Sequence, residues 1–261
     1  MDLKIMREKL NRLKNAGKAS EHLWKPEEGK QIIRIVPLAS NPDNPFTEMY
    51  FHYGMNGKTY LSPRTFGKPD PIADFADKLK GDGSKESYEQ AKPFLPKMRT
   101  YVPIVVRGKE SDGVKFWAFG KTVCEQILSI IDDEDYGDIT DPQTGRDIVV
   151  EFTPKDKSDT NFAKTSIRPK PSQTKITSDA ELLNKVLTQQ PDLSTMFREY
   201  TPAELQSILE TYLSMGDTSS DTQDETPTPE KFTSPSAEKA VGSESAVSTV
   251  EEQFDKLFND E

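Results

Sequence analysis

The chain has 261 residues, of which 33% are hydrophobic, and a net charge of −10. Its single cysteine, Cys124, excludes an intrachain disulfide and a metal site made of several cysteines. The sequence contains no apolar run of the ~18 residues that a membrane-spanning helix needs and no signal-peptide core after Met1, so we expect a soluble intracellular protein.

The first predicted element is a basic amphipathic helix over residues 3–14, which Gly17 would end. Leucine and methionine recur along one side of this helix, and lysine and arginine surround them. We expect residues 1–20 to dock on the body of the protein or on a neighbouring copy in self-association. A direct contact with DNA is the alternative.

Short strands follow this helix. They are rich in β-branched and aromatic residues, and Asn56-Gly57 predicts a hairpin turn between two of them. Pro103 suggests that its strand lies at an edge of the sheet or carries a bulge. Short strands separated by turns favour a small barrel or sandwich. The predicted strands are residues 31–36, 48–53, 58–61, 99–107, 114–119 and 146–152.

Helices are predicted between and after the strands. Apolar residues share one helical face in residues 72–79 and 123–131. Two capping boxes, Ser178 to Glu181 and Thr201 to Glu204, predict two further helices. We expect these two helices to form one small helical unit near residues 177–214.

The expected fold class is mainly β with flanking helices (α+β). Residues 21–216 are predicted to form the core, and residues 161–170 a basic loop without strong periodicity. A disordered acidic tail over residues 217–261 completes the chain.

This tail holds most of the net negative charge. It contains 12 acidic and 3 basic residues, whereas residues 1–175 contain 29 basic and 26 acidic ones. A slightly basic body with an acidic tail is typical of a protein that binds a polyanion and carries a tethered mimic of it. The tail ends in an amphipathic motif, in which Phe254, Leu257 and Phe258 are expected to bind partner proteins. A tail that only improves solubility is the alternative.

Strand 114–119 combines cations and aromatic rings. Alternate residues of a strand share a face, so Lys115, Trp117 and Phe119 point the same way, and Lys121 continues the basic line. Bases stack on rings at ~1–3 kcal/mol each and cations neutralise phosphates, so this pattern fits a single-stranded nucleic acid. The alternative is that the rings belong to the core and the charges form a solvated rim.

No catalytic arrangement is evident. Neither His22 nor His52 has a nearby Ser, Cys or Asp that suggests a triad. Asp132 to Asp135 could support a metal-dependent nuclease, but consecutive carboxylates do not converge on one ion without a dedicated loop. The sequence also lacks a glycine-rich phosphate loop. We therefore predict that the protein is not an enzyme.

The order of these features resembles a known family. Three segments, residues 29–37, 52–60 and 114–121, together with the acidic terminus, are similar to the single-stranded DNA-binding protein of T-even-type bacteriophages, the gene 32 helix-destabilising protein family. The resemblance implies an OB-fold core and cooperative, sequence-independent binding of single-stranded DNA. It also implies roles in phage DNA replication, recombination and repair, in the cytoplasm of the infected bacterial host.

The resemblance further implies a zinc ion held by one histidine and three cysteines, and here the sequence departs from the family. His52 keeps the histidine, but Asp70, Ala73 and Arg64 stand where cysteines are expected. One histidine without cysteines cannot complete a tetrahedral zinc site. We predict that the protein has no cofactor, and that the helix over residues 72–79 packs in place of zinc.

The residue pattern and the resemblance together nominate the DNA-binding residues. Trp117 occupies the place of a family aromatic that stacks on bases. The alternative function is a protein-interaction or assembly module, because aromatic residues and arginine are also enriched at protein interfaces. The nominated residues are Trp117, Phe119, Tyr60, Tyr101 and Phe162 for stacking, and Lys58, Arg64, Arg99, Lys115, Lys121, Lys164 and Arg168 for phosphate contacts.

Overall fold

The computed structural model describes residues 19–81 and 83–214. These residues form two compact units. Unit 1 contains residues 19–49 and 98–197, and unit 2 contains the remainder of the described residues. The predicted basic helix at residues 3–14 and the tail with Phe254, Leu257 and Phe258 lie outside the described residues.

Unit 1 is built on a mixed sheet with the strand order β1-β6-β5-β2-β7-β8. β1 runs parallel to β6, and the other neighbours are antiparallel. A four-residue helix, α2 (Ala19–His22), leads into β1. The strands are β1 (Leu23–Trp24), β2 (Gly29–Ile35), β5 (Lys97–Val106), β6 (Lys115–Phe119), β7 (Arg146–Thr153) and β8 (Lys164–Gln173).

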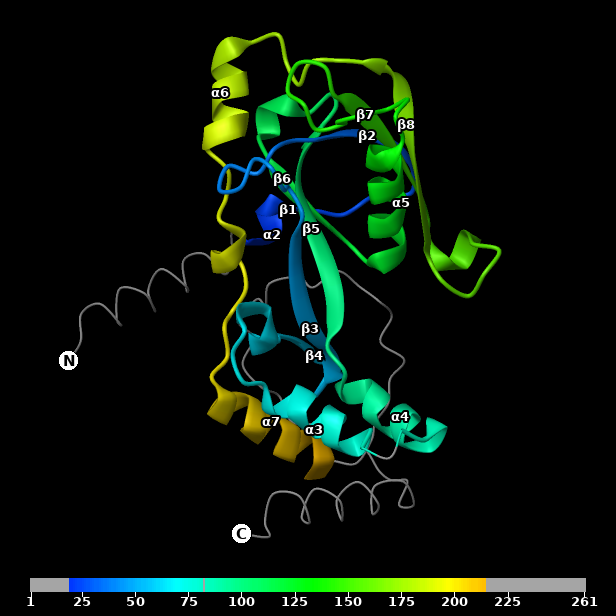
Figure 1. The fold of residues 1–261 in the computed structure, drawn as a ribbon, viewed down its shortest axis with the longest axis vertical. Helices are drawn as coiled ribbons and strands as arrows, with labels where there is room; N and C mark the ends of the chain where they lie inside the picture. Colours follow the sequence, from blue (N-terminus) through cyan, green and yellow to red (C-terminus); the bar gives the residue numbers. More distant parts are fainter. Residues whose placement is uncertain (1–18, 82, 215–261) are drawn as a thin grey trace, which may run out of the picture. The chain divides into compact units, whose positions relative to one another are not determined.

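One face of this sheet packs against α5 (Lys121–Asp132), which Figure 1 shows alongside the strands. The strand residues on this face alternate with residues of the other face, as the period of a strand requires. Val123, Cys124 and Ile127 of α5 close the core from the helix side. The buried strand residues of this core are Ile33, Ile35, Val102, Ile104, Trp117, Phe119, Ile148 and Val150.

Part of the opposite face is covered by α6 (Ala180–Thr188). Val186 of this helix is buried with Val105 of β5 and with Val36, Val114 and Ile176. The remainder of that face, formed by the ends of β2, β7 and β8 away from α6, carries exposed side chains.

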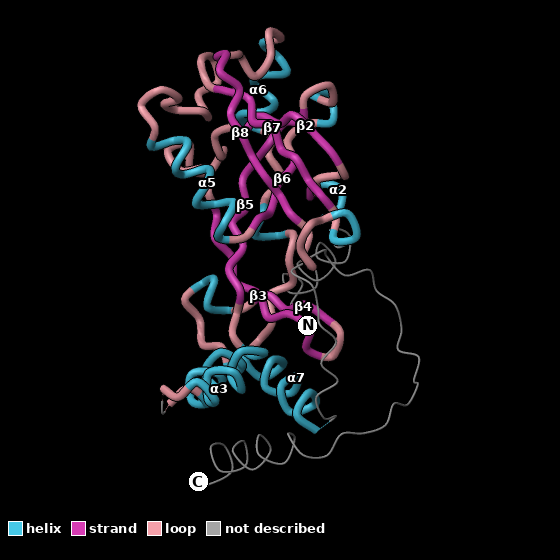
Figure 2. Tube along the Cα trace, turned by 90° about the vertical axis from the view of Figure 1, so that its right-hand side faces the viewer, coloured by secondary structure: helices cyan, strands magenta, loops and turns pink. Residues whose placement is uncertain are grey.

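Unit 2 combines a hairpin with helices. β3 (Thr47–Met55) and β4 (Lys58–Leu61) are joined by Asn56 and Gly57, whose φ angles of 52° and 70° are those of the two-residue turn predicted for an Asn-Gly pair. The chain leaves unit 1 within β3 and returns to it within β5. The helices are α3 (Pro71–Leu79), α4 (Lys85–Ala91) and α7 (Pro202–Ser214), and Figure 2 shows α3 and α7 side by side.

The core of unit 2 forms between these helices and the hairpin. Ile72, Phe75 and Leu79 of α3 are buried with Leu205 and Leu209 of α7. Short 3₁₀ turns also occur in both units, at Pro63–Phe66, Lys92–Phe94, Glu110–Asp112, Lys155–Lys157 and Leu193–Thr195. No helix in the described part of the chain is both long and apolar enough to cross a membrane.

The α+β class, dominated by strands, is confirmed. The capping box at Thr201 is also confirmed, since the Glu204 N–H donates to Thr201 Oγ1 at 3.3 Å and the Thr201 N–H donates to Glu204 Oε2 at 2.8 Å. At the other predicted box the cap is Asp179 rather than Ser178. The OB-fold stays a prediction that rests on the resemblance.

The expected helical unit near residues 177–214 is wrong. α6 belongs to unit 1 and α7 to unit 2, because their apolar faces pack in different cores. The edge position expected for Pro103 is also wrong, since β5 lies between β6 and β2. Pro103 fits there because its carbonyl accepts from the Val36 N–H, so its own nitrogen faces the point where β2 has already ended.

Candidate nucleic-acid interface

The rings of β6 lie in the core of unit 1. Lys115, Trp117 and Phe119 share a face, as expected, but α5 covers that face and Trp117 is only 1% exposed. Trp117 packs edge to face against Trp24 at 5.6 Å between centroids and against Phe119 at 4.7 Å. In this structure neither Trp117 nor Phe119 presents a ring face on which a base can stack, which favours the core alternative for this strand.

Three other nominated residues are buried as well. Tyr60 lies in the core of unit 2, edge to face with Tyr200 at 5.2 Å. Tyr101 lies in unit 1 against Phe197 at 5.5 Å and has no exposed surface. Arg99 is 5% exposed and donates to the Met98 carbonyl, so it does not offer its charge to a surface ligand. The sequence pattern correctly indicated a mixture of rings and cations, but it did not predict that these side chains are buried.

Phe162 differs from all of these rings. Its side chain is 73% exposed, the largest value among the exposed large hydrophobic residues of the described chain. It lies in the loop that joins β7 to β8, which projects at the side of unit 1 in Figure 1. An apolar ring of this size on a projecting loop has no folding role that would explain its exposure, so it is a candidate for binding.

Cations continue from Phe162 along β8. Residues 161–170 were expected to form a loop, but most of them form this strand, with Lys164, Ser166 and Arg168 exposed. Thr165 and Ile167 alternate with them and are half-buried. The strand escaped prediction because two prolines and few apolar residues obscure its alternation, and an edge strand tolerates both.

The part of the hairpin that follows β7 is basic. Residues 154–175 include six basic and two acidic side chains, and among the basic ones Lys157 is bound to Glu28 at 2.6 Å. Lys30 of β2 extends the same surface, because β2 pairs with β7 and β7 with β8 through the row Lys30, Glu151 and Ser166. Sequence reasoning missed Lys30, Lys155, Lys157 and Lys170; the density of lysine between residues 155 and 175 was the available signal.

The remaining nominated cations belong to elements other than β8. Lys115 is half-buried near Asp112, and Lys121 in the first turn of α5 is exposed beside Glu125. In unit 2, Lys58 is exposed on β4.

Arg64 is also in unit 2, and its charge is already neutralised. Its Nη2 lies 2.7 Å from a carboxylate oxygen of Asp74 and 2.7 Å from one of Asp77. Partial burial by itself would lower the pKa of Arg64, but these two carboxylates outweigh it and raise the pKa. Arg64 is therefore a weaker candidate for a phosphate contact than the β8 cations.

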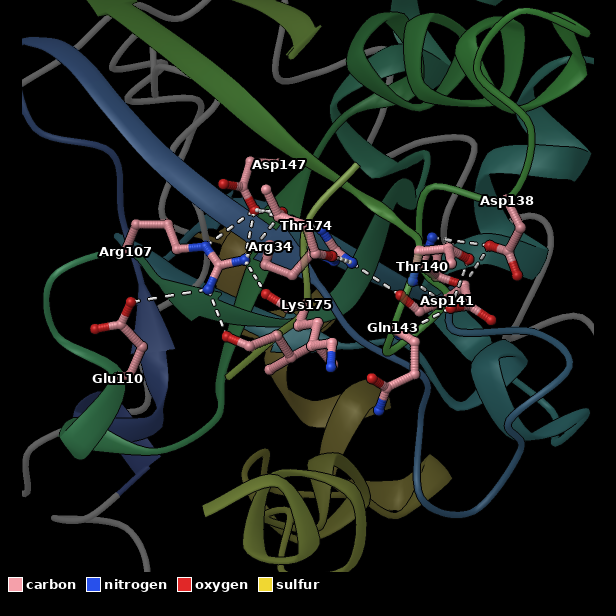
Figure 3. A network of polar contacts seen from close by, with 12 residues as sticks. Arg34, Arg107, Glu110, Asp138, Thr140, Asp141, Gln143, Asp147, Thr174 and Lys175 are labelled. Carbon is pink, nitrogen blue, oxygen red and sulfur yellow. Dashed lines mark hydrogen bonds and ion pairs between the residues drawn. The ribbon is translucent and has the colours of Figure 1, made fainter. Parts of the chain in front are cut away.

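A buried ionic network holds the end of β8 in place (Figure 3). Two arginines, Arg34 of β2 and Arg107 after β5, share one carboxylate oxygen of Asp147 at 3.4 and 2.7 Å. Arg34 Nη2 also donates to the Thr174 carbonyl at 2.7 Å, and Arg107 Nη2 to the Lys175 carbonyl at 2.9 Å. The network thus fixes residues 174–176, directly after β8, to β2, to β7 and to the residue that follows β5.

The same network fixes the loop before β7. Arg34 Nη2 donates to the Asp141 carbonyl at 2.8 Å, and a side chain at Gly145 would meet this nitrogen at 2.6 Å, so only glycine fits there. Burial lowers the pKa of the Arg34 guanidinium, and Asp147 acts against this effect. A buried guanidinium without an ionic partner would destabilise the fold, so the carboxylate of Asp147 is needed to keep Arg34 in the sheet. The network therefore anchors the end of β8 to the rest of the sheet.

Comparison with known families shows to which family the chain belongs. A family model described as gp32 DNA binding protein like matches residues 27–217, most of the chain. The chain belongs to this family. A search of curated proteins with the chain finds no match. Membership of the gp32-like family makes the protein a DNA-binding protein, and the resemblance drawn from the sequence is confirmed.

The gp32-like family is a DNA-binding family, which agrees with the lack of a catalytic arrangement in the sequence. Of the carboxylates that could support a nuclease, Asp132 is the last residue of α5, and Asp133 to Asp135 follow it in a turn where the Asp135 N–H donates to Asp133 Oδ1. In the described residues, no group of three His, Cys, Asp or Glu side chains is arranged to hold a metal ion.

Proposed function

We propose that this protein binds single-stranded DNA without sequence preference through the β7–β8 hairpin of unit 1. The observation that carries the proposal is the exposed ring of Phe162 at the start of a basic strand. Single-stranded DNA needs rings for its bases and cations for its phosphates, and Phe162, Lys164 and Arg168 supply both within one hairpin. Membership of the gp32-like DNA-binding family supports this use of the surface.

Spacing along the strand also supports the proposal. Residues of a strand rise about 3.3 Å each, so Lys164 and Arg168 lie about 13 Å apart along β8 and can contact separate phosphates of one DNA strand. Lys164 and Arg168 lie on the same face, with Ser166 between them. Their contacts would be to the backbone, so base identity would have little effect on affinity.

We further propose that the protein coats and protects single strands during phage DNA replication, recombination and repair, in the cytoplasm of the infected host. In this proposal residues 217–261 compete with DNA for the basic surface, because they carry 12 acidic residues. Once DNA displaces the tail, Phe254, Leu257 and Phe258 recruit replication and recombination proteins. Residues 1–20 are proposed to mediate contacts between neighbouring copies.

The decisive test is a titration of a fluorescent unstructured single strand of 20–30 nucleotides with the full chain, followed by anisotropy at low and moderate salt. We expect tight binding that weakens steeply with salt and that is much weaker for a duplex of the same length. A chain that ends at Gly216 should bind more tightly at low salt, since it lacks the competing tail.

Two results would contradict the proposal. Failure of both the full and the shortened chain to bind the single strand would direct attention to the alternative, a protein-interaction module. Equal affinity of the two chains at low salt would contradict the competition by the tail while leaving the hairpin as the DNA-binding surface.

A further inference from the structure

Unit 2 contains a buried polar cluster at the start of α3. His52 of β3, Ser62 after β4 and Asp70 before α3 are all completely buried. His52 Nε2 lies 2.9 Å from Asp70 Oδ2, and His52 Nδ1 lies 3.0 Å from the carbonyl oxygen of Phe94. A carbonyl oxygen only accepts hydrogen bonds, so Nδ1 carries a proton and donates it to Phe94.

Asp70 is the centre of this cluster. Its Oδ2 accepts from the Ser62 hydroxyl as well as facing His52, and its Oδ1 accepts from the backbone N–H groups of Ile72 and Ala73 at 3.1 and 3.2 Å. Burial would raise the pKa of the Asp70 carboxyl, but the hydrogen bonds from His52, Ser62 and Ala73 outweigh burial and lower it. One carboxylate therefore connects β3, the end of β4 and the first turn of α3.

The cluster lies where the family resemblance places a zinc ion. His52 and Asp70, two of the positions at which zinc ligands were expected, do meet in the structure. Ala73 contributes only its backbone N–H, and Arg64 binds surface carboxylates instead. The only cysteine, Cys124, is buried in the core of unit 1.

These residues do not fit zinc. A structural zinc site takes four ligands, usually cysteine and histidine, each of which must direct a free electron pair at the ion. Both ring nitrogens of His52 and both carboxylate oxygens of Asp70 are already engaged in hydrogen bonds inside the protein. In the described residues no third His, Cys, Asp or Glu is close enough to complete a metal site with them.

We infer that Ser62, Asp70, His52 and the Phe94 carbonyl form a metal-free crosslink, the Asp70 network, that holds unit 2 together in place of the family's zinc. It connects two strands, the start of α3 and the 3₁₀ turn Lys92–Phe94. A buried network of this kind stabilises the fold only while every member is paired, because each lost partner leaves a desolvated polar group behind. This inference concerns stability and does not rest on the proposed DNA binding.

The test compares three variants of the full chain. Asp70→Asn keeps the shape of the side chain but removes its charge, and we expect it to lower the melting temperature by roughly 6–15 °C. Ser62→Ala removes one donor and should have a smaller effect in the same direction, which keeps the test usable if Asp70→Asn does not fold. Asp74→Asn is the matched control on α3, because Asp74 is exposed and bound to Arg64, and it should shift the melting temperature by less than about 2 °C.

Hydrogen exchange locates the effect. In Asp70→Asn and Ser62→Ala, amides at the start of α3, including Ile72 and Ala73, should exchange at least about tenfold faster than in the Asp74→Asn control. If Asp70→Asn and Ser62→Ala both behave like Asp74→Asn in melting and exchange, the Asp70 network does not hold unit 2 together and the inference fails.

Metal analysis provides the second arm. Tag-free protein should contain well below one zinc per chain, and a strong chelator should leave its melting temperature unchanged. Stoichiometric zinc, or a wild-type melting temperature that falls with the chelator, would overturn the inference. Because neither arm uses DNA, failure here is distinct from failure of the DNA-binding titration.

Discussion

Strand β6 and the β7–β8 hairpin have similar sequences in one respect, since both place aromatic rings next to lysine or arginine. They differ in burial. In β6, Trp117 and Phe119 pack beneath α5, whereas Phe162 in the hairpin is 73% exposed and is followed by the exposed Lys164 and Arg168. A mixture of rings and cations therefore indicates a nucleic-acid surface only where the rings have no helix or sheet to pack against.

The largest effect expected from this difference is on stability at Trp117. Replacing a buried tryptophan by alanine removes its packing and leaves a cavity, so Trp117→Ala should lower the free energy of unfolding by ~3–5 kcal/mol. Below its melting temperature, the folded variant should bind single-stranded DNA about as tightly as the parent. Urea unfolding followed by anisotropy titration measures both quantities.

Trp117→Phe provides the milder version of this change if the alanine variant does not fold. Loss of DNA affinity by either variant, with stability close to that of the parent, would mean that Trp117 reaches the DNA and that the burial of β6 does not hold in solution.

The strands of the core could be predicted from the sequence, because the alternating or clustered β-branched residues of β2, β5 and β7 are typical of buried strands. The Asn56-Gly57 turn was equally predictable, since both residues adopt positive φ angles there. β8 was not, because an exposed edge strand with Pro169 and Pro171 lacks the apolar repeat that marks a strand.

The candidate site was only partly predictable for a physical reason. Period-two alternation states which residues share a face but not which face α5 will cover, so Trp117 and Phe162 could not be separated by pattern alone. The pairing of α6 with unit 1 and of α7 with unit 2 was hidden in the same way, because an apolar helix face does not specify its partner.

The next largest effect is expected on affinity at Phe162. Removal of a ring that stacks on a base should weaken single-strand binding by ~1–3 kcal/mol, or roughly 5- to 150-fold. Stability should change by less than about 0.5 kcal/mol, because Phe162→Ala removes a solvated side chain. Trp117→Ala and Phe162→Ala would then have opposite profiles of stability and affinity.

Tyr88→Ala is the matched control for Phe162→Ala. Tyr88 is 49% exposed on α4, but its neighbours on that helix include Glu86 and Glu89, which would repel phosphates. An equal loss of affinity in both variants would show that exposed rings contribute nonspecifically, and unchanged affinity in Phe162→Ala would remove the ring from the proposed interface.

The smallest effect is expected for the cations of β8, and salt dependence measures it best. Each phosphate contact that is lost should reduce the slope of the logarithm of the binding constant against the logarithm of salt concentration by about 0.7 for a single strand. Lys164→Gln and Arg168→Gln should each reduce the slope by this amount, and the double variant by about twice as much. Lys92→Gln, an exposed lysine of unit 2 paired with Glu89, is the control and should leave the slope unchanged. Equal slopes in the double variant and in the control would place the phosphate contacts outside β8, and the hairpin would then contribute only its ring to the interface.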